Sequence, residues 1–158
     1  MRGFFAIGIE HPKTHHNIGT LWRSAYAFGA AFIFTIGPQR YTKQASDTLC
    51  VWRHIPLLHF ASLDHFQESR PHDCELVGVE YLPDASILRK VAHPQRAVYL
   101  LGAEDHGLTK QSLAMCQRLV RIPAAYCLNV ATAGSIVMYD RSAKADRSFS
   151  KAISEVAP

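Results

Sequence analysis

Short apolar runs, each the length of a buried strand, alternate with segments of helical spacing along this chain. The run at 97–102 reads AVYLLG and carries no charge on either face, and the runs at 4–9 and 32–36 are nearly as apolar. A strand that is apolar on both faces needs cover on both, which is typical of parallel sheets flanked by helices. The alternation therefore predicts one α/β domain over residues 1–158, with a mostly parallel sheet and helices on both of its faces.

Sequence signals for helix starts, helix ends and turns predict the elements in the rest of the chain. Amphipathic spacing, caps and a glycine stop at Gly29 predict helices at 17–28, at 62–69, from Thr109 to Leu119 and from Asn129 onward. Weaker patterns predict short strands at 57–60, 75–79 and 120–122, a helical turn at 85–91 and a polar surface loop at 39–53. From about Ala143 the residues are polar without a periodic face, so we expect a tail there.

Composition narrows the class of protein. The formal net charge of +4 and the isoelectric point near 9.0 suit a polyanionic partner, although charge alone is weak evidence for one. The longest apolar stretch, 25–36, is shorter than the ~20 residues that a membrane span needs, and the first ten residues lack a signal-peptide layout. The four cysteines and nine histidines show no metal-ligand spacing. We expect a reduced, cytoplasmic protein without a metal ion.

The first candidate segment is the helix that begins NIGTLWR at Asn17. Its apolar stripe faces the core, so Gly19 and Arg23 share a different stripe, with the Arg23 side chain leaning back over Gly19. Open backbone at a helix N-terminus beneath a guanidinium favours an anion such as an RNA phosphate. The alternative is an ordinary helix start with Arg23 in a surface ion pair.

Two further segments follow strands, at the edge where open parallel sheets bind ligands. Residues 102–108 read GAEDHGL, and their glycines and acids suit a ligand with hydroxyl groups, although an ordinary loop also carries glycine. Residues 122–134 read IPAAYCLNVATAG and lead into the last helix, where apolar Ile136 to Tyr139 predict burial on more than one face. Either a partner subunit or the chain's own core could cover that helix. The chain contains no dinucleotide fingerprint, P-loop or nucleophile elbow.

In this order, the three segments resemble the signature of the SpoU-type branch of the SPOUT superfamily of RNA methyltransferases. The matching residues are Asn17, Gly19 and Arg23, then Gly102, Glu104, Gly107 and Leu108, then Ile122, Pro123, Leu128, Asn129 and Val130. The resemblance spans residues 3–141. It implies S-adenosylmethionine as the cofactor, RNA as the substrate, a homodimer, and a deep trefoil knot formed by the C-terminal segment.

The resemblance also implies roles for single residues. The cofactor pocket is expected to be walled by Val79, Gly102, Ile122, Cys127 and Leu128. The catalytic centre is expected to hold Arg23, Asn17 and Asn129, and the substrate side Glu104, Gly19 and His16. Because a guanidinium pKa above ~12 disfavours arginine as a free base, we expect Arg23 to bind a phosphate and stabilise the developing alkoxide.

Two residues depart from the family pattern, since Cys127 and Ala131 stand where the family carries serines. Both are small, so we expect the pocket shape to persist while hydroxyl hydrogen bonds are lost. Direct methyl transfer argues against a nucleophilic Cys127. The resemblance therefore implies an RNA ribose 2′-O-methyltransferase. Because no added RNA-binding domain is evident, the chain resembles the family members that act on transfer RNA. A base methyltransferase of a related branch and a catalytically silent RNA-binding dimer stay open as alternatives.

Overall fold

The structure, a computed structural model, describes residues 3–41 and 50–145. Its strands are β1 (Phe5–Glu10), β2 (Ile33–Ile36), β3 (Leu57–Phe60), β4 (Glu75–Val79), β5 (Ser86–Ile87), β6 (Ala97–Leu101) and β7 (Arg118–Arg121). The helices are α1 (His15–Phe28), α2 (Leu63–Ser69), α3 (Lys110–Met115) and α4 (Val130–Ala145), with 3₁₀ turns η1 (Val51–Arg53) and η2 (Leu88–Lys90). Among the described helices, none combines the length and apolar character that a bilayer crossing requires.

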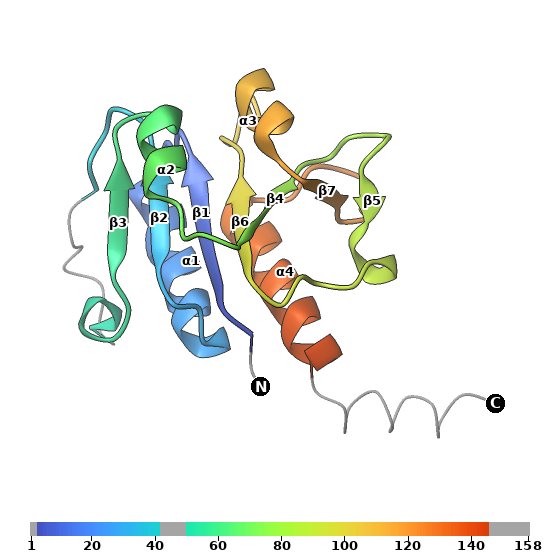
Figure 1. Ribbon diagram of the computed structural model, residues 1–158, viewed down its shortest axis with the longest axis horizontal. Coiled ribbons are helices and arrows are strands. Elements are labelled where there is room, and N and C mark those ends of the chain that lie inside the picture. The colour runs from blue at the N-terminus through green and yellow to red at the C-terminus, as the bar shows by residue number, and fades with distance from the viewer. Residues whose placement is uncertain (1–2, 42–49, 146–158) are drawn as a thin grey trace.

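The strands form one sheet in the order β3-β2-β1-β6-β4-β7-β5, which Figure 1 shows edge to edge. Every strand pair in the described residues is parallel. Strand β6 lies between β1 and β4, and Ala97 at its start is in register with both Phe5 and Glu75. The predicted parallel α/β domain is thus confirmed, with the most apolar strand of the sequence in the interior of the sheet.

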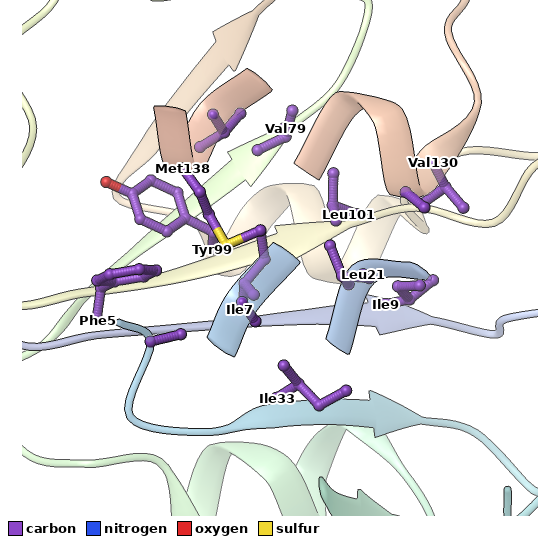
Figure 2. Packing of buried hydrophobic residues seen from close by; sticks show 14 of the residues in the cluster. Phe5, Ile7, Ile9, Leu21, Ile33, Val79, Tyr99, Leu101, Val130 and Met138 are labelled. Atoms are coloured by element: carbon purple, nitrogen blue, oxygen red, sulfur yellow. The ribbon is translucent and has the colours of Figure 1, made fainter. Parts of the chain in front are cut away.

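Helices cover both faces of the sheet, as predicted. Helices α1 and α4 pack on one face, where Ile7 and Leu101 of the sheet meet Leu21 of α1 and Met138 of α4 (Figure 2). Gly134 permits this close packing, because a Cβ at that position would lie 2.4 Å from the Leu21 Cδ1 atom. The other face carries α2 and α3, packed over a second cluster of buried aromatic and aliphatic residues around Phe34, Phe60, Phe66 and Leu113.

The helix ends follow from the capping residues. Thr14, Ser62 and Thr109 each accept a hydrogen bond from the backbone three residues on, at the starts of α1, α2 and α3. Gly29 ends α1 in the left-handed conformation, with a φ of 76°. The expected caps at Ser62 and Thr109 and the stop at Gly29 are therefore confirmed, whereas α1 begins two residues before the expected Asn17.

Four elements differ from the prediction. Helix α3 ends at Met115 instead of Leu119, because residues 118–121 pair with β4 as β7. The expected turn at 85–91 is the short strand β5 followed by η2. In the expected loop at 39–53, η1 forms and Val51 is buried, while 42–49 lie outside the described residues. Helix α4 runs to Ala145, past the expected start of a tail at 143.

Close strand packing makes Gly8 a sensitive position. A Cβ on Gly8 would lie 2.5 Å from the Phe34 carbonyl oxygen of neighbouring β2 and 2.4 Å from the Phe34 ring. We therefore expect Gly8→Ala to lower the free energy of unfolding by about 2 kcal/mol or more, measured by urea denaturation. Gly19→Ala is the matched control, because nothing lies within 4 Å of its Cβ position, and helix propensity should raise stability by up to ~1 kcal/mol. A Gly8→Ala protein as stable as wild type would contradict this packing.

Candidate active site

A cavity of about 520 Å³ lies beyond the carboxyl ends of three neighbouring strands, β6, β4 and β7. Its walls come from the loop residues that follow each strand and from the first turn of α4. This is the edge at which parallel sheets bind ligands. From the same rule we expect the chemistry in the loops after residues 9, 79, 102 and 122. The last three loops line this cavity, whereas residues 11–14 after β1 do not.

All five residues expected to wall a cofactor pocket line this cavity, namely Val79, Gly102, Ile122, Cys127 and Leu128. Gly102 packs so tightly that a Cβ there would lie 2.1 Å from the Gly107 carbonyl carbon. Any larger residue at position 102 would push the following loop into the cavity or away from it. The backbone at Gly102 therefore shapes the cavity wall.

The polar residues Asn17, Glu104 and Asn129 form a hydrogen-bonded chain beside the cavity. Glu104 accepts hydrogen bonds from the Asn17 side-chain amide and from the Lys13 backbone amide, the latter at 3.3 Å. Asn17 Oδ1 in turn accepts from Asn129 Nδ2 at 2.9 Å. Asn129 Oδ1 accepts from the amides of residues 131 and 132 and so caps α4. One residue from each of the three sequence motifs meets in this chain, and Glu104 and Asn129 face the cavity.

Arg23, Gly19 and His16 lie apart from these residues. All three are exposed on α1, and none of them lines the cavity. Asn17 is buried, and Arg23, six positions later, lies roughly 120° away around the helix axis. One side of α1 therefore holds the polar chain while another side presents Arg23 to solvent. Within one chain, the structure does not bring Arg23 to the cavity.

Two carboxylates that sequence reasoning missed hold the loop between β6 and α3. Glu10, the last residue of β1, is buried and accepts hydrogen bonds from the Thr109 amide at 2.9 Å and from the Thr109 and Ser112 hydroxyls. Glu80, directly after β4, accepts from the Leu108 amide at 2.7 Å. The backbone amides of two consecutive residues, Leu108 and Thr109, are thus bound by carboxylates from β4 and β1, the strands on either side of β6. The available signal was an acid at the end of a strand that is otherwise apolar.

Charged groups tie the start of α1 to the same loop. Lys13 Nζ forms an ion pair with Asp105, and this hydrogen bond lowers the pKa of the Asp105 carboxyl group. His106 Nε2 lies 2.9 Å from the same carboxylate, and the ring is exposed to solvent. In residues 3–41 and 50–145, no three His, Cys, Asp or Glu side chains are grouped closely enough to hold a metal ion.

The loop before α4 presents free backbone groups. Residues 125–128 are exposed, and three of them line the cavity. Their backbone amides donate to no other group in the described part of the chain. Free amides in a concave site are typical of positions where a ligand's acceptors complete the hydrogen bonding.

A parallel sheet with helices on both faces and a loop-walled cavity beyond its strand ends defines an α/β protein built to bind a small ligand. The family model described as SpoU rRNA Methylase family matches residues 5–139 of this chain. The chain therefore belongs to that family.

Individual relatives and solved structures are similar to this chain at low sequence identity. The 23S rRNA (guanosine-2'-O-)-methyltransferase RlmB of Bordetella pertussis is 28% identical, over 84% of this chain and 56% of that protein. The SpoU methyltransferase AviRb from Streptomyces viridochromogenes, in complex with AdoMet, has a TM-score of 0.81 at 22% identity, covering 92% of this chain and 62% of that one. A structure concerned with 2-OH methylation of C/U34 on tRNA has a TM-score of 0.77 at 21% identity, covering 92% and 98%. The chain thus spans little more than half the length of the curated relative.

The clamp at Glu10 predicts a measurable stability effect. Glu10→Ala leaves the Thr109 amide and two hydroxyl groups without this acceptor, one of them on the fully buried Ser112, so we expect it to lower the free energy of unfolding by about 3 kcal/mol. Glu10→Gln keeps an acceptor oxygen for the Thr109 amide and should lose clearly less. Thermal and urea denaturation of both variants give the comparison. An Ala variant as stable as wild type would show that the clamp does not hold the loop.

Proposed function

We propose that this chain is an S-adenosylmethionine-dependent RNA 2′-O-methyltransferase with transfer RNA as its substrate. The observation that carries the proposal is the cavity, which all five expected cofactor residues line in a chain of the SpoU family. The name of the Bordetella relative supports ribose as the methyl acceptor. The similar structure concerned with 2-OH methylation of C/U34 on tRNA supports transfer RNA as the substrate.

The cavity fits the cofactor in size and chemistry. Its volume of about 520 Å³ lies within the ~300–1,000 Å³ of small-molecule sites. Val79, Ile122 and Leu128 offer an apolar slot for a purine ring, and the free amides of 125–128 suit its nitrogen acceptors. When bound, S-adenosylmethionine supplies an electrophilic methyl group on a sulfonium sulfur.

The polar chain beside the cavity suits the RNA side of the reaction. Asn129 and Glu104 face the cavity and Asn17 links them, so their amide and carboxylate groups can orient a ribose 2′-hydroxyl. Holding that hydroxyl in line with the methyl group supplies much of the rate acceleration. Arg23 binds the adjacent phosphate and stabilises the developing alkoxide. The hydroxyl proton passes to the phosphate or to water, because a guanidinium has no acceptor site.

The position of Arg23 supports a homodimer with composite active sites. Helices α1 and α4 share one face of the sheet and expose Tyr26 and Tyr139, which are 41% and 55% exposed. The two exposed rings give the helix layer formed by α1 and α4 an apolar contact surface. Since Arg23 lies outside the cavity of its own chain, pairing of two copies across this face is the arrangement that takes it to an active site. The trefoil knot and the cytoplasmic location stay predictions.

Methyl transfer from labelled S-adenosylmethionine to transfer RNA tests the function. The labelled nucleotide should resist alkaline cleavage on its 3′ side, because a methylated 2′ oxygen cannot attack the neighbouring phosphate. Label at an alkali-labile position would instead indicate a base methyltransferase. If calorimetry detects no binding of S-adenosylmethionine or of its demethylated product, the silent RNA-binding dimer takes the place of the enzyme.

Arg23 gives a sharper prediction. Arg23→Ala should lower the methylation rate by about 10² or more while the dissociation constant for S-adenosylmethionine stays unchanged, because Arg23 does not line the cavity. Arg23→Lys should rescue poorly, since a point charge does not reproduce the planar fork. Arg89→Ala is the control, because it removes the same charge from an exposed residue of η2 outside the cavity. An unchanged rate in Arg23→Ala would discard this role.

Mixed dimers test whether the active sites are composite. Gly102→Ala should disrupt the cavity, because its Cβ would collide with Gly107 and displace the loop that forms part of the wall, while Arg23→Ala leaves the cavity intact. Each variant alone should have a strongly reduced methylation rate. A dimer of one copy of each has one open cavity facing an intact Arg23 from the other copy, so activity should return at one of its two sites. Inactive mixed dimers would show that Arg23 acts within its own chain.

A further inference from the structure

The cavity of this basic protein has three acidic residues in its lining. Its lining contains Glu80, Glu104 and Asp105 but no lysine or arginine, although the whole chain carries a formal net charge of +4. Asp105 is paired with Lys13, and Glu104 belongs to the polar chain with Asn17. No ion pair joins Glu80 to a cation within the described residues. Glu104 also lacks an ion pair in that part of the chain, but it is hydrogen-bonded to Asn17 on the proposed RNA side. Glu80 directly follows Val79, one of the expected cofactor residues, so its charge lies on the cofactor side of the lining.

Backbone groups alone hold the Glu80 carboxylate in place. Oε1 accepts from its neighbour's amide, that of Tyr81, at 2.9 Å, and Oε2 accepts from the Leu108 amide at 2.7 Å. Gly107, at a φ of +66°, packs against it so closely that a Cβ would lie 2.4 Å from Oε2. These contacts satisfy the oxygens but bring no opposite charge. A half-buried carboxylate fixed in this way favours a cation placed beside it.

We infer that Glu80 distinguishes the two forms of the cofactor by their charge, an inference that rests on the proposed function. S-adenosylmethionine carries a sulfonium cation, whereas its demethylated product, S-adenosylhomocysteine, carries a neutral thioether in the same place. A fixed negative charge in a partly desolvated site attracts the first and not the second. Because methyl transfer removes the positive charge, the same carboxylate holds the product less tightly and favours its release.

Glu80→Gln separates charge from shape. Glutamine keeps an acceptor oxygen for the Leu108 amide but loses the negative charge, so the loop should stay in place. Calorimetry gives the Kd of S-adenosylmethionine, of S-adenosylhomocysteine, and of sinefungin, in which a carbon replaces the sulfur and carries an ammonium group in place of the methyl group. We expect the preference for each cationic ligand over S-adenosylhomocysteine to fall about fivefold in Glu80→Gln, the effect of one unit charge at several ångströms in a partly solvated site.

Glu10→Gln is the matched control. It removes a carboxylate that binds the next amide of the same loop, but Glu10 is buried and does not line the cavity. Its ligand preferences should equal those of wild type. A second test uses the wild-type protein alone, so it does not depend on the folding of a variant. Added salt screens the charge of Glu80 and should therefore lower the wild-type preference for S-adenosylmethionine over its demethylated product.

The possible outcomes separate this inference from the proposed function. If wild type binds none of the three ligands, the proposed function itself fails. If Glu80→Gln weakens all three equally, Glu80 contacts a part that they share, either the adenosine or the ammonium of the amino-acid end, and the inference about the sulfonium charge is wrong. Unchanged preferences in Glu80→Gln, or a wild-type preference that does not depend on salt, overturn it as well.

Discussion

The loop between β6 and α3 depends on two carboxylates that accept consecutive backbone amides. Glu80 binds the amide of Leu108 from the β4 side, and Glu10 binds that of Thr109 from the β1 side. β1 and β4 are the two neighbours of β6, so the sheet order itself brings these acids to the loop. Amides at the start of a helix have no partner within the helix, and here side chains supply one. The cavity wall at Gly102 and the position of Glu104 both follow from this loop.

Much of the fold was predictable because burial leaves a strong pattern in sequence. Runs that are apolar on both faces marked the interior strands, and capping residues marked the starts of α2 and α3. The errors fall where long-range pairing decides the structure. Residues 118–121 form a strand because they lie against β4, and the two-residue strand β5 is too short to carry a periodic signal.

The part of the candidate site that the family resemblance names was predictable from the sequence. The resemblance named the five cavity residues and the three members of the polar chain, which meet although they lie far apart in sequence. Glu10 and Glu80 were missed because an acid at a strand end shows its partner only once the strands are ordered in space. Helical spacing placed Arg23 away from the apolar stripe of α1, but it could not show on which side of the helix the cavity lies.

The pairing of β1 with β6 also bears on how the chain is made. Phe5 is in register with Ala97, so about 90 residues are synthesised between the two strands. At about 5–20 residues per second on the ribosome, one edge of β1 waits roughly 5–20 s for its partner. During that time an apolar strand presents unpaired backbone groups, which invite pairing with other chains. The nascent chain is therefore most exposed to mispairing in this interval, whose length follows from the sequence separation of β1 and β6 and from the rate of synthesis.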